Sequence, residues 1–165
     1  QETGNFRVVE YGPLDAVGQG ALPSWHFVTG TFAYLSHPVT GRVEWVRWAS
    51  LDGSPSKALA DKYAPKGAGA VLAFEIAGGL EAGQRFVEGL TLHSHVANIG
   101  DVRSLAIHPA STTHSQGGDE DRLAAGVTPG LVRLAVGLES IADILADLDA
   151  GFAAAAGGAS ATAAE

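Results

Sequence analysis

The 165-residue chain contains no cysteine, no methionine and few basic residues. Without cysteine it has no disulfide, no thiolate metal site and no cysteine nucleophile. Its 10 lysines and arginines stand against 18 acidic residues, and the net charge of -8 argues against nucleic acid or anionic lipid as a partner. No apolar run approaches the roughly 18 residues that a membrane-spanning helix needs, and no secretory signal opens the chain. The sequence therefore predicts no membrane association.

The composition is that of a folded domain. With 46% hydrophobic and 17% charged residues, the chain is not a low-complexity or disordered polymer. Its length suits one domain, which buries roughly two thirds of the surface that the unfolded chain exposes. Because the chain begins with Gln1 and not with methionine, we expect it to have been trimmed, processed or cut from a longer protein.

Apolar periodicity and turn residues predict alternating strands and helices. Segments rich in β-branched and aromatic residues indicate strands at residues 43–48, 70–76 and 131–136. Helical spacing and capping residues predict one helix that ends before Pro38 and others at residues 54–63, 81–90, 119–125 and 140–148. This alternation predicts an α/β or α+β layer, a small sheet with helices packed on it.

Three segments lack a clear period. Residues 1–30 stay unassigned, apart from a short strand expected at residues 6–11. Residues 92–107 mix polar and apolar side chains densely, which indicates the wall of a cavity or an interface. Residues 153–165 are almost all alanine, glycine, serine and threonine, which predicts a disordered tail. No repeat and no linker divides residues 31–152, so we expect one domain there.

Arg133 lies in the middle of the strand expected at residues 131–136. The period of two places it on one face with Leu131 and Ala135. An arginine in such a place needs a partner, and its planar fork suits a carboxylate. It is either a clamp for a substrate carboxylate or half of an internal ion pair with Asp101 or Glu139. The pattern alone favours the ion pair, because paired structural arginines are the commoner case.

Other polar residues give weaker signals. No G-x-S-x-G elbow surrounds a serine, and the glycine pairs lack a phosphate-loop frame. Lysines 57, 62 and 66 fall on or beside a solvent-facing helix and are predicted to be surface charges. Four histidines have no metal-binding frame around them, so we expect hydrogen-bonded neutral imidazoles and no metal site: His93, His95, His108 and His114.

Three stretches carry a more specific signal. They are residues 54–72 with Lys62–Gly67 (KYAPKG), residues 95–114 with Ala97–Asp101 (ANIGD) and Ser111–His114 (STTH), and residues 125–139 with Leu131–Glu139 (LVRLAVGLE). Together they resemble the C-terminal domain of the pyridoxal-phosphate (PLP) enzymes of Cys/Met metabolism, specifically the O-acetylhomoserine sulfhydrylase (homocysteine synthase) branch. The resemblance covers residues 31–152, most of the chain.

The resemblance implies an aminotransferase-like fold of type I, in which a large domain holds PLP and a smaller C-terminal domain closes over the substrate. It implies a cytoplasmic homotetramer that acts in methionine biosynthesis and replaces the acetate of O-acetylhomoserine by sulfide to give homocysteine. Arg133 matches the family's carboxylate-binding arginine, and Asn98 matches a position that helps to orient that carboxylate. Cystathionine-processing relatives usually carry serine there, so Asn98 favours the sulfhydrylase branch.

The departures from the family pattern limit what this chain does alone. No stretch matches the cofactor lysine, so the resemblance implies no catalytic residue here and a PLP held by the absent N-terminal domain. We therefore expect the chain to be inactive by itself and to work with the remainder of the enzyme or with a companion chain. Two alternatives stay open. One is a non-catalytic, carboxylate-binding remnant domain, and the other is a related cystathionine γ-synthase or γ-lyase.

Overall fold

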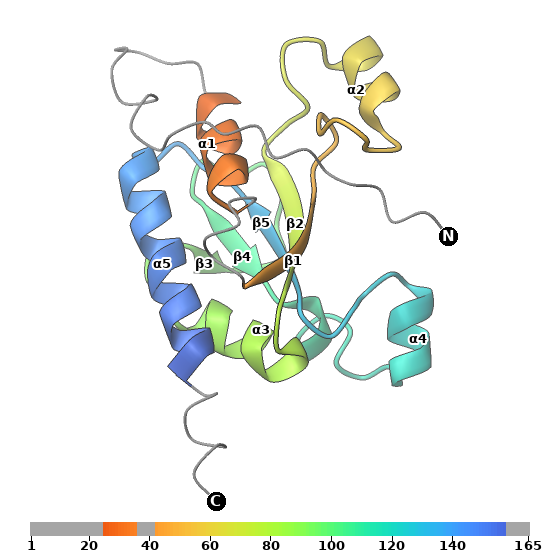
Figure 1. The fold of residues 1–165 in the computed structure, drawn as a ribbon, viewed down its shortest axis with the longest axis vertical. Helices are drawn as coiled ribbons and strands as arrows, with labels where there is room; N and C mark the ends of the chain where they lie inside the picture. Colours follow the sequence, from red (N-terminus) through yellow and green to blue (C-terminus); the bar gives the residue numbers. More distant parts are fainter. Residues whose placement is uncertain (1–24, 36–41, 158–165) are drawn as a thin grey trace, which may run out of the picture.

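The computed structural model of the chain describes residues 25–35 and 42–157 (Figure 1). In this part of the chain, five strands form one sheet in the order β1-β2-β5-β4-β3. Neighbouring strands are antiparallel except β3 and β4, which are parallel. The strands are β1 (Val43–Arg47), β2 (Val71–Ile76), β3 (Ser94–His95), β4 (Leu105–Ile107) and β5 (Leu131–Ala135). The strand expected at residues 6–11 lies outside the described residues.

Helices cover one face of this sheet. α3 (Gly79–Glu88) and α5 (Ile141–Gly157) pack against each other and the sheet, and α1 (Trp25–Leu35) lies against α5. Figure 1 shows α2 (Lys57–Tyr63) and α4 (Asp119–Ala124) standing away from this layer, at the ends of long connections. A 3-10 turn, η2 (Pro109–Ser111), follows β4. The predicted class, a small sheet with helices packed on it, is confirmed.

Three phenylalanines form the centre of the core. Phe74 of β2, Phe86 of α3 and Phe152 of α5 are buried, and their rings lie 4.8–6.1 Å apart between centroids. Edge-to-face and tilted aromatic pairs of this kind add to the free energy gained by burying apolar area. Val132 and Leu134 point from β5 into the same core, so the side chain of Arg133 between them lies on the opposite face.

The strand register places four residues in one row on that opposite face. Arg47 of β1 pairs with Ala73 of β2, Ala73 pairs with Arg133 of β5, and Arg133 pairs with Ile107 of β4. Ala73 is small, so it leaves room beside the guanidinium of Arg133. The expected placement of Arg133 in mid-strand is therefore confirmed, and the structure adds that its face points away from the helices.

The end of α5 corrects one expectation. Residues 153–165 were expected to be a disordered tail, but the helix continues to Gly157. Alanine is the best helix former, and the side chains of Phe152 and Ala155 are buried on the inner face of the helix. A Cβ on Gly151 would lie 2.8 Å from a methyl carbon of Leu90, so glycine lets α5 approach α3 closely. Residues 158–165 lie outside the described residues.

The start of α2 also differs from the prediction. The pair Ser54-Pro55 was expected to open the helix, but the helix begins at Lys57 with Ser56 as its N-cap residue. The hydroxyl of Ser54 accepts a hydrogen bond from the main-chain N–H of Ser56 instead (3.2 Å). Such a local turn competes with the helix for the same backbone groups. Residues 54–56 therefore form the turn that precedes the helix.

His108 ties η2 to the turn before β5. Its Nε2 donates to the carbonyl oxygen of Pro129 (2.7 Å), and its Nδ1 lies 2.7 Å from Oγ of Ser111. Because a carbonyl oxygen only accepts, Nε2 carries the proton and Nδ1 is left to accept from the serine hydroxyl. The side chain is fully buried, and this burial lowers the pKa of His108 below its ordinary 6.5, although Pro129 and Glu75 oppose the shift.

We expect this buried histidine to make stability fall as the pH drops below 6.5. The unfolded chain then binds a proton that the folded chain resists, so the free energy of unfolding decreases, by at most about 1.4 kcal/mol per pH unit for one proton. Urea unfolding at pH values between about 7.5 and 5, which lie on both sides of the ordinary histidine pKa of about 6.5, measures this slope. His108→Gln should flatten it, whereas the exposed His114→Gln should leave it unchanged. Equal slopes in all three proteins would contradict the prediction.

Candidate functional site

The guanidinium of Arg133 is held by a neighbouring loop. Nη2 donates to the carbonyl oxygen of Ala97 (2.7 Å) and, more weakly, to that of Asn98 (3.4 Å). The side chain is half-buried, and its Nε is buried without a hydrogen-bond partner in the described part of the chain. A charged donor left in that state is costly, because it has lost water and gained no acceptor.

The ion pair that the pattern alone favoured is not formed. The carboxylate of Asp101 accepts from Arg103, at 3.2 Å from Nε and 3.0 Å from Nη2. The carboxylate of Glu139 accepts from the main-chain N–H and the hydroxyl of Ser104. No acidic side chain among residues 42–157 pairs with Arg133. Within the described residues, the positive charge of Arg133 is therefore balanced only by two main-chain dipoles.

The two predicted site residues, Arg133 and Asn98, meet in the structure. Asn98 lies in the loop between β3 and β4, and its main-chain oxygen faces the guanidinium. The residue itself is exposed. Ala97 makes the shorter bond to Arg133, and sequence reasoning missed it, because a main-chain acceptor leaves no signal in residue type. The interpretation of residues 92–107 as the wall of a cavity or an interface overlooked two short strands, β3 and β4.

Carboxylates in this region have shifted pKa values. The hydrogen bonds from the side chain and the N–H of Arg103 lower the pKa of Asp101 to about 2. Burial raises the pKa of Glu139, but hydrogen bonds from Ser104 outweigh it and leave that pKa below its ordinary value. Both groups are ionised at neutral pH, and both are already engaged by other partners. A carboxylate that neutralises Arg133 would therefore have to come from outside residues 42–157.

The arrangement around Arg133 suits an external carboxylate. A guanidinium offers five N–H donors in a planar fork, and among the described residues only Nη2 of Arg133 finds an acceptor. Hydrogen bonds between a guanidinium and a carboxylate are short and about twice as strong as those between neutral groups. The site can therefore bind and orient a carboxylate. It contains no nucleophile or general base within the contacts that the structure describes around Arg133.

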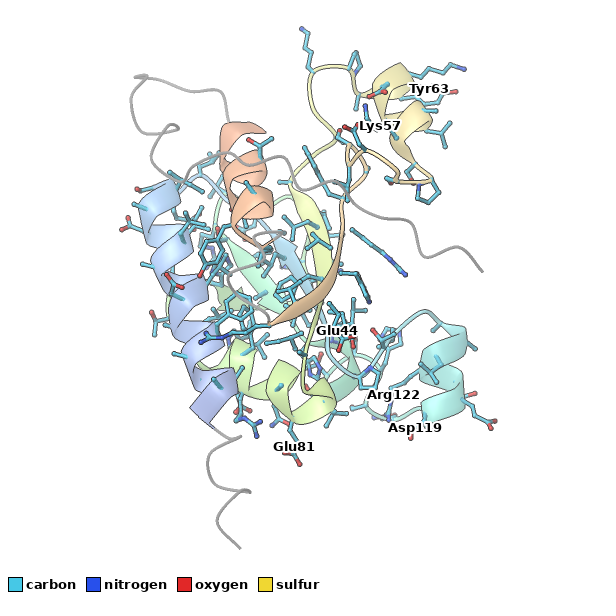
Figure 2. The ribbon with its side chains drawn as sticks, viewed as in Figure 1. Glu44, Lys57, Tyr63, Glu81, Asp119 and Arg122 are labelled. Atoms are coloured by element: carbon cyan, nitrogen blue, oxygen red, sulfur yellow. The ribbon has the colours of Figure 1, made fainter. Side chains whose placement is uncertain are left out.

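A lysine that binds PLP lies in a desolvated pocket in the complete enzyme, whereas the three lysines of this chain lie at its surface. Figure 2 shows Lys57 on the α2 arm, away from the sheet. Its Nζ pairs with the carboxylate of Asp61 (2.8 Å), which raises the pKa of Lys57. Lys62 stacks over the ring of Tyr63 and is exposed, as is Lys66. The three lysines are therefore surface residues, as predicted.

The four histidines singled out in the sequence do not converge on one site in the structure. His93 and His108 are buried and hydrogen-bonded, whereas His95 and His114 are exposed on different segments. Among residues 25–35 and 42–157, no three histidine, aspartate or glutamate side chains are placed to hold a metal ion. No helix in the same residues is long and apolar enough to cross a membrane.

Comparisons with known proteins place this geometry in context. The family model described as Cys/Met metabolism PLP-dependent enzyme matches residues 32–153. An O-acetyl-L-homoserine sulfhydrylase of Leptospira meyeri is 53% identical over 114 residues, which are 68% of this chain and 25% of that protein. An L-methionine gamma-lyase of Pseudomonas deceptionensis is 50% identical over 113 residues, 68% of this chain and 27% of that protein.

A solved structure shows the same fold. The cystathionine gamma synthase of Xanthomonas oryzae pv. oryzae, in complex with cystathionine, superposes with a TM-score of 0.70 and 38% identity. The match covers 81% of this chain and 34% of that one. The chain spans about a quarter of the length of the curated relatives that it matches.

Proposed function

The chain belongs to the Cys/Met metabolism PLP-dependent enzyme family, and from this premise we propose that it is the domain of an O-acetylhomoserine sulfhydrylase that binds the substrate carboxylate. The observation that carries the proposal is the guanidinium of Arg133, which has no acidic partner in residues 42–157 and has a buried Nε without an acceptor. The identity of about 50% to named sulfhydrylases supports the substrate class.

The complete enzyme would replace the acetate of O-acetylhomoserine by sulfide, which gives homocysteine and acetate. PLP, when bound, supplies the electron sink for such chemistry. The part of this chain is to hold the α-carboxylate on Arg133, which fixes the orientation of the amino acid relative to the cofactor. Correct orientation removes rotational freedom before the reaction and so contributes to the rate. Asn98 would help to orient the same carboxylate.

The cofactor and its lysine would come from the remainder of the enzyme or from a companion chain. The chain spans about a quarter of its curated relatives, and its lysines lie at the surface. Val102 and Leu138 lie side by side, joined by a main-chain hydrogen bond, yet they are 67% and 60% exposed. Exposed apolar pairs suit contact with another domain. A cytoplasmic homotetramer is part of the same proposal.

A related γ-lyase or γ-synthase is the second candidate. The gamma-lyase of Pseudomonas deceptionensis is nearly as similar as the sulfhydrylases, and the solved synthase has the same fold. Asn98 favours the sulfhydrylase. Turnover of O-acetylhomoserine with sulfide, with cysteine and with neither would separate the three activities.

We expect the 165-residue chain, incubated with PLP and then freed of unbound cofactor, to form no homocysteine and to retain no stoichiometric visible absorption band that borohydride bleaches. The native protein purified from its source should form homocysteine and show such an absorption band, because it would include the cofactor lysine. Intact mass, the absorption spectrum and a homocysteine assay measure these outcomes. Homocysteine formation by the isolated chain would contradict the assignment of the cofactor site to another domain. A colourless native protein of the present mass would favour a carboxylate-binding domain without catalysis.

A further inference from the structure

The loop that holds Arg133 has little packing of its own. It runs from Val96 to Arg103, between β3 and β4, and its apolar side chains face solvent, with Ile99 66% and Val102 67% exposed. A segment without buried side chains is positioned by its ends and by its main-chain contacts. The oxygens of Ala97 and Asn98 can hold Arg133 in one orientation only if those ends are fixed.

Ser104 fixes the C-terminal end of this loop. It is fully buried, and each of its polar atoms is engaged. Its N–H and its hydroxyl donate to the two carboxylate oxygens of Glu139, at 2.7 and 2.8 Å. Its Oγ accepts from the N–H of Gly137 (2.9 Å), and its carbonyl oxygen accepts from the N–H of Ser94 (2.9 Å). We call Ser104 and Glu139 the latch.

Gly137 shows how closely the latch is packed. A Cβ on this residue would lie 2.5 Å from the main-chain nitrogen of Ser104 and 2.5 Å from the carbonyl carbon of Arg103. No side chain fits there without moving backbone atoms. The N–H of Leu138 also donates to the carbonyl oxygen of Val102 (2.9 Å), so the loop is bound at two adjacent points.

The latch and Arg133 belong to the same stretch of chain. Gly137 and Glu139 follow directly on β5, the strand that carries Arg133. The contacts therefore form a closed ring, from Arg133 to the loop oxygens, along the loop to Ser104, and back through Glu139 to the end of β5. A ring of this kind fixes the distance between the guanidinium and the loop that orients it.

We propose that Ser104 and Glu139 are positioning residues for carboxylate binding. They hold the loop Val96–Arg103 so that its carbonyl oxygens engage Nη2 of Arg133 and leave the exposed part of the fork for the ligand. They do not touch the ligand themselves. This inference rests on the proposed function, because it presupposes that Arg133 binds a carboxylate.

The test is calorimetric titration of the native protein with two probes, L-norleucine and L-norleucinamide. The probes share a side chain and differ in the carboxylate, so the ratio of their Kd values reports carboxylate recognition and needs no turnover. In Ser104→Ala and in Glu139→Gln we expect the Kd for norleucine to rise roughly tenfold, since small misplacements of a positioning group have effects of this order or larger. The Kd for norleucinamide should stay unchanged. The double variant should lose no more than either single one, because both remove the same contact.

Two further variants separate the possible failures. Phe152→Leu alters the helix layer far from the loop, so it should lower the Tm and leave the ratio of Kd values intact. If the latch variants lower only the Tm, or weaken both probes equally, Ser104 and Glu139 are merely structural and the inference is wrong. If Arg133→Lys also leaves the ratio unchanged, the proposed function itself fails. If Arg133→Lys changes the ratio of Kd values and neither latch variant does, the positioning role of Ser104 and Glu139 is wrong but the proposed function stands.

Discussion

Replacement of Arg133 by alanine is expected to reduce kcat/KM of the native enzyme for its amino-acid substrate by about 10²-fold to 10³-fold. Truncating one member of a buried, hydrogen-bonded charge pair costs about 2–5 kcal/mol, and every 1.4 kcal/mol is roughly a factor of ten. No acidic side chain in residues 42–157 pairs with Arg133, so the free chain loses little when the guanidinium is removed. The loss therefore appears in ligand binding, and steady-state kinetics measure it.

Arg47→Ala is the matched control for this substitution. Arg47 lies in the same row of the same sheet face, one strand beyond Ala73, and it stacks over the ring of Trp45 at 4.3 Å. Its removal changes the net charge equally and should leave kcat/KM unchanged. Arg133→Lys keeps the charge but not the planar fork, and should fall between the wild type and Arg133→Ala. If Arg133→Ala and Arg47→Ala reduced kcat/KM by the same factor, the effect would come from net charge, and the assignment of Arg133 as the carboxylate-binding residue would be wrong.

The second large effect is expected at Asp147, on the inner face of α5. Its carboxylate accepts hydrogen bonds from the N–H groups of Thr91, Leu92 and His93, and from the side chains of Thr91 and His93, all within 3.0 Å. Asp147→Ala should destabilise the fold by about 3–5 kcal/mol, because the buried donors of His93 and the partly buried donors of Thr91 and Leu92 lose their acceptor. Urea unfolding measures the loss, which corresponds to a Tm lowered by roughly 10 °C.

Asp143→Ala is the control, because Asp143 is an exposed carboxylate in the first turn of the same helix. It should cost about 1 kcal/mol or less. Burial raises the pKa of Asp147, but the hydrogen bonds outweigh burial and leave it below the ordinary 3.8. The stability it contributes is therefore present above about pH 4 and is lost as the pH falls through the folded pKa. The difference in the free energy of unfolding between the wild type and Asp147→Ala should therefore become smaller in acid. A difference that stays constant with pH would contradict the role of the ionised Asp147 carboxylate as the acceptor.

The sequence contains a signal for Asp147 that periodicity alone does not interpret. Asp147 lies three residues after Ile144 and four before Gly151, on the buried side of α5. An aspartate inside an apolar stripe must accept hydrogen bonds there, because a buried charge without partners is too costly. Which donors it meets depends on residues 91–93, more than fifty positions away. The pattern therefore predicts a buried carboxylate but not its partners.

The same difference between local patterns and distant contacts explains which features of the site could be predicted from the sequence. The mid-strand position of Arg133 follows from the alternation of β5, which is a local pattern. The strands β3 and β4 have two and three residues, too few for any period, so residues 92–107 gave no strand signal. The choice between a clamp and an ion pair depended on where Asp101 and Glu139 point. Asp101 turns to Arg103 within its own loop, and Glu139 turns to Ser104.

The position of β5 in the sheet gives the two halves of the site different mechanical properties. β5 is hydrogen-bonded to β2 on one side and to β4 on the other, so the Cα of Arg133 cannot shift without disturbing both neighbours. The loop Val96–Arg103 lacks such neighbours and is held at Ser104 and by main-chain contacts, so its exposed side chains can change while its length is constrained. Under the proposed function, the arginine would provide affinity from a rigid base, whereas the loop would set the orientation of its guanidinium. An engineer who wishes to alter ligand preference would therefore vary the loop and leave the strand untouched.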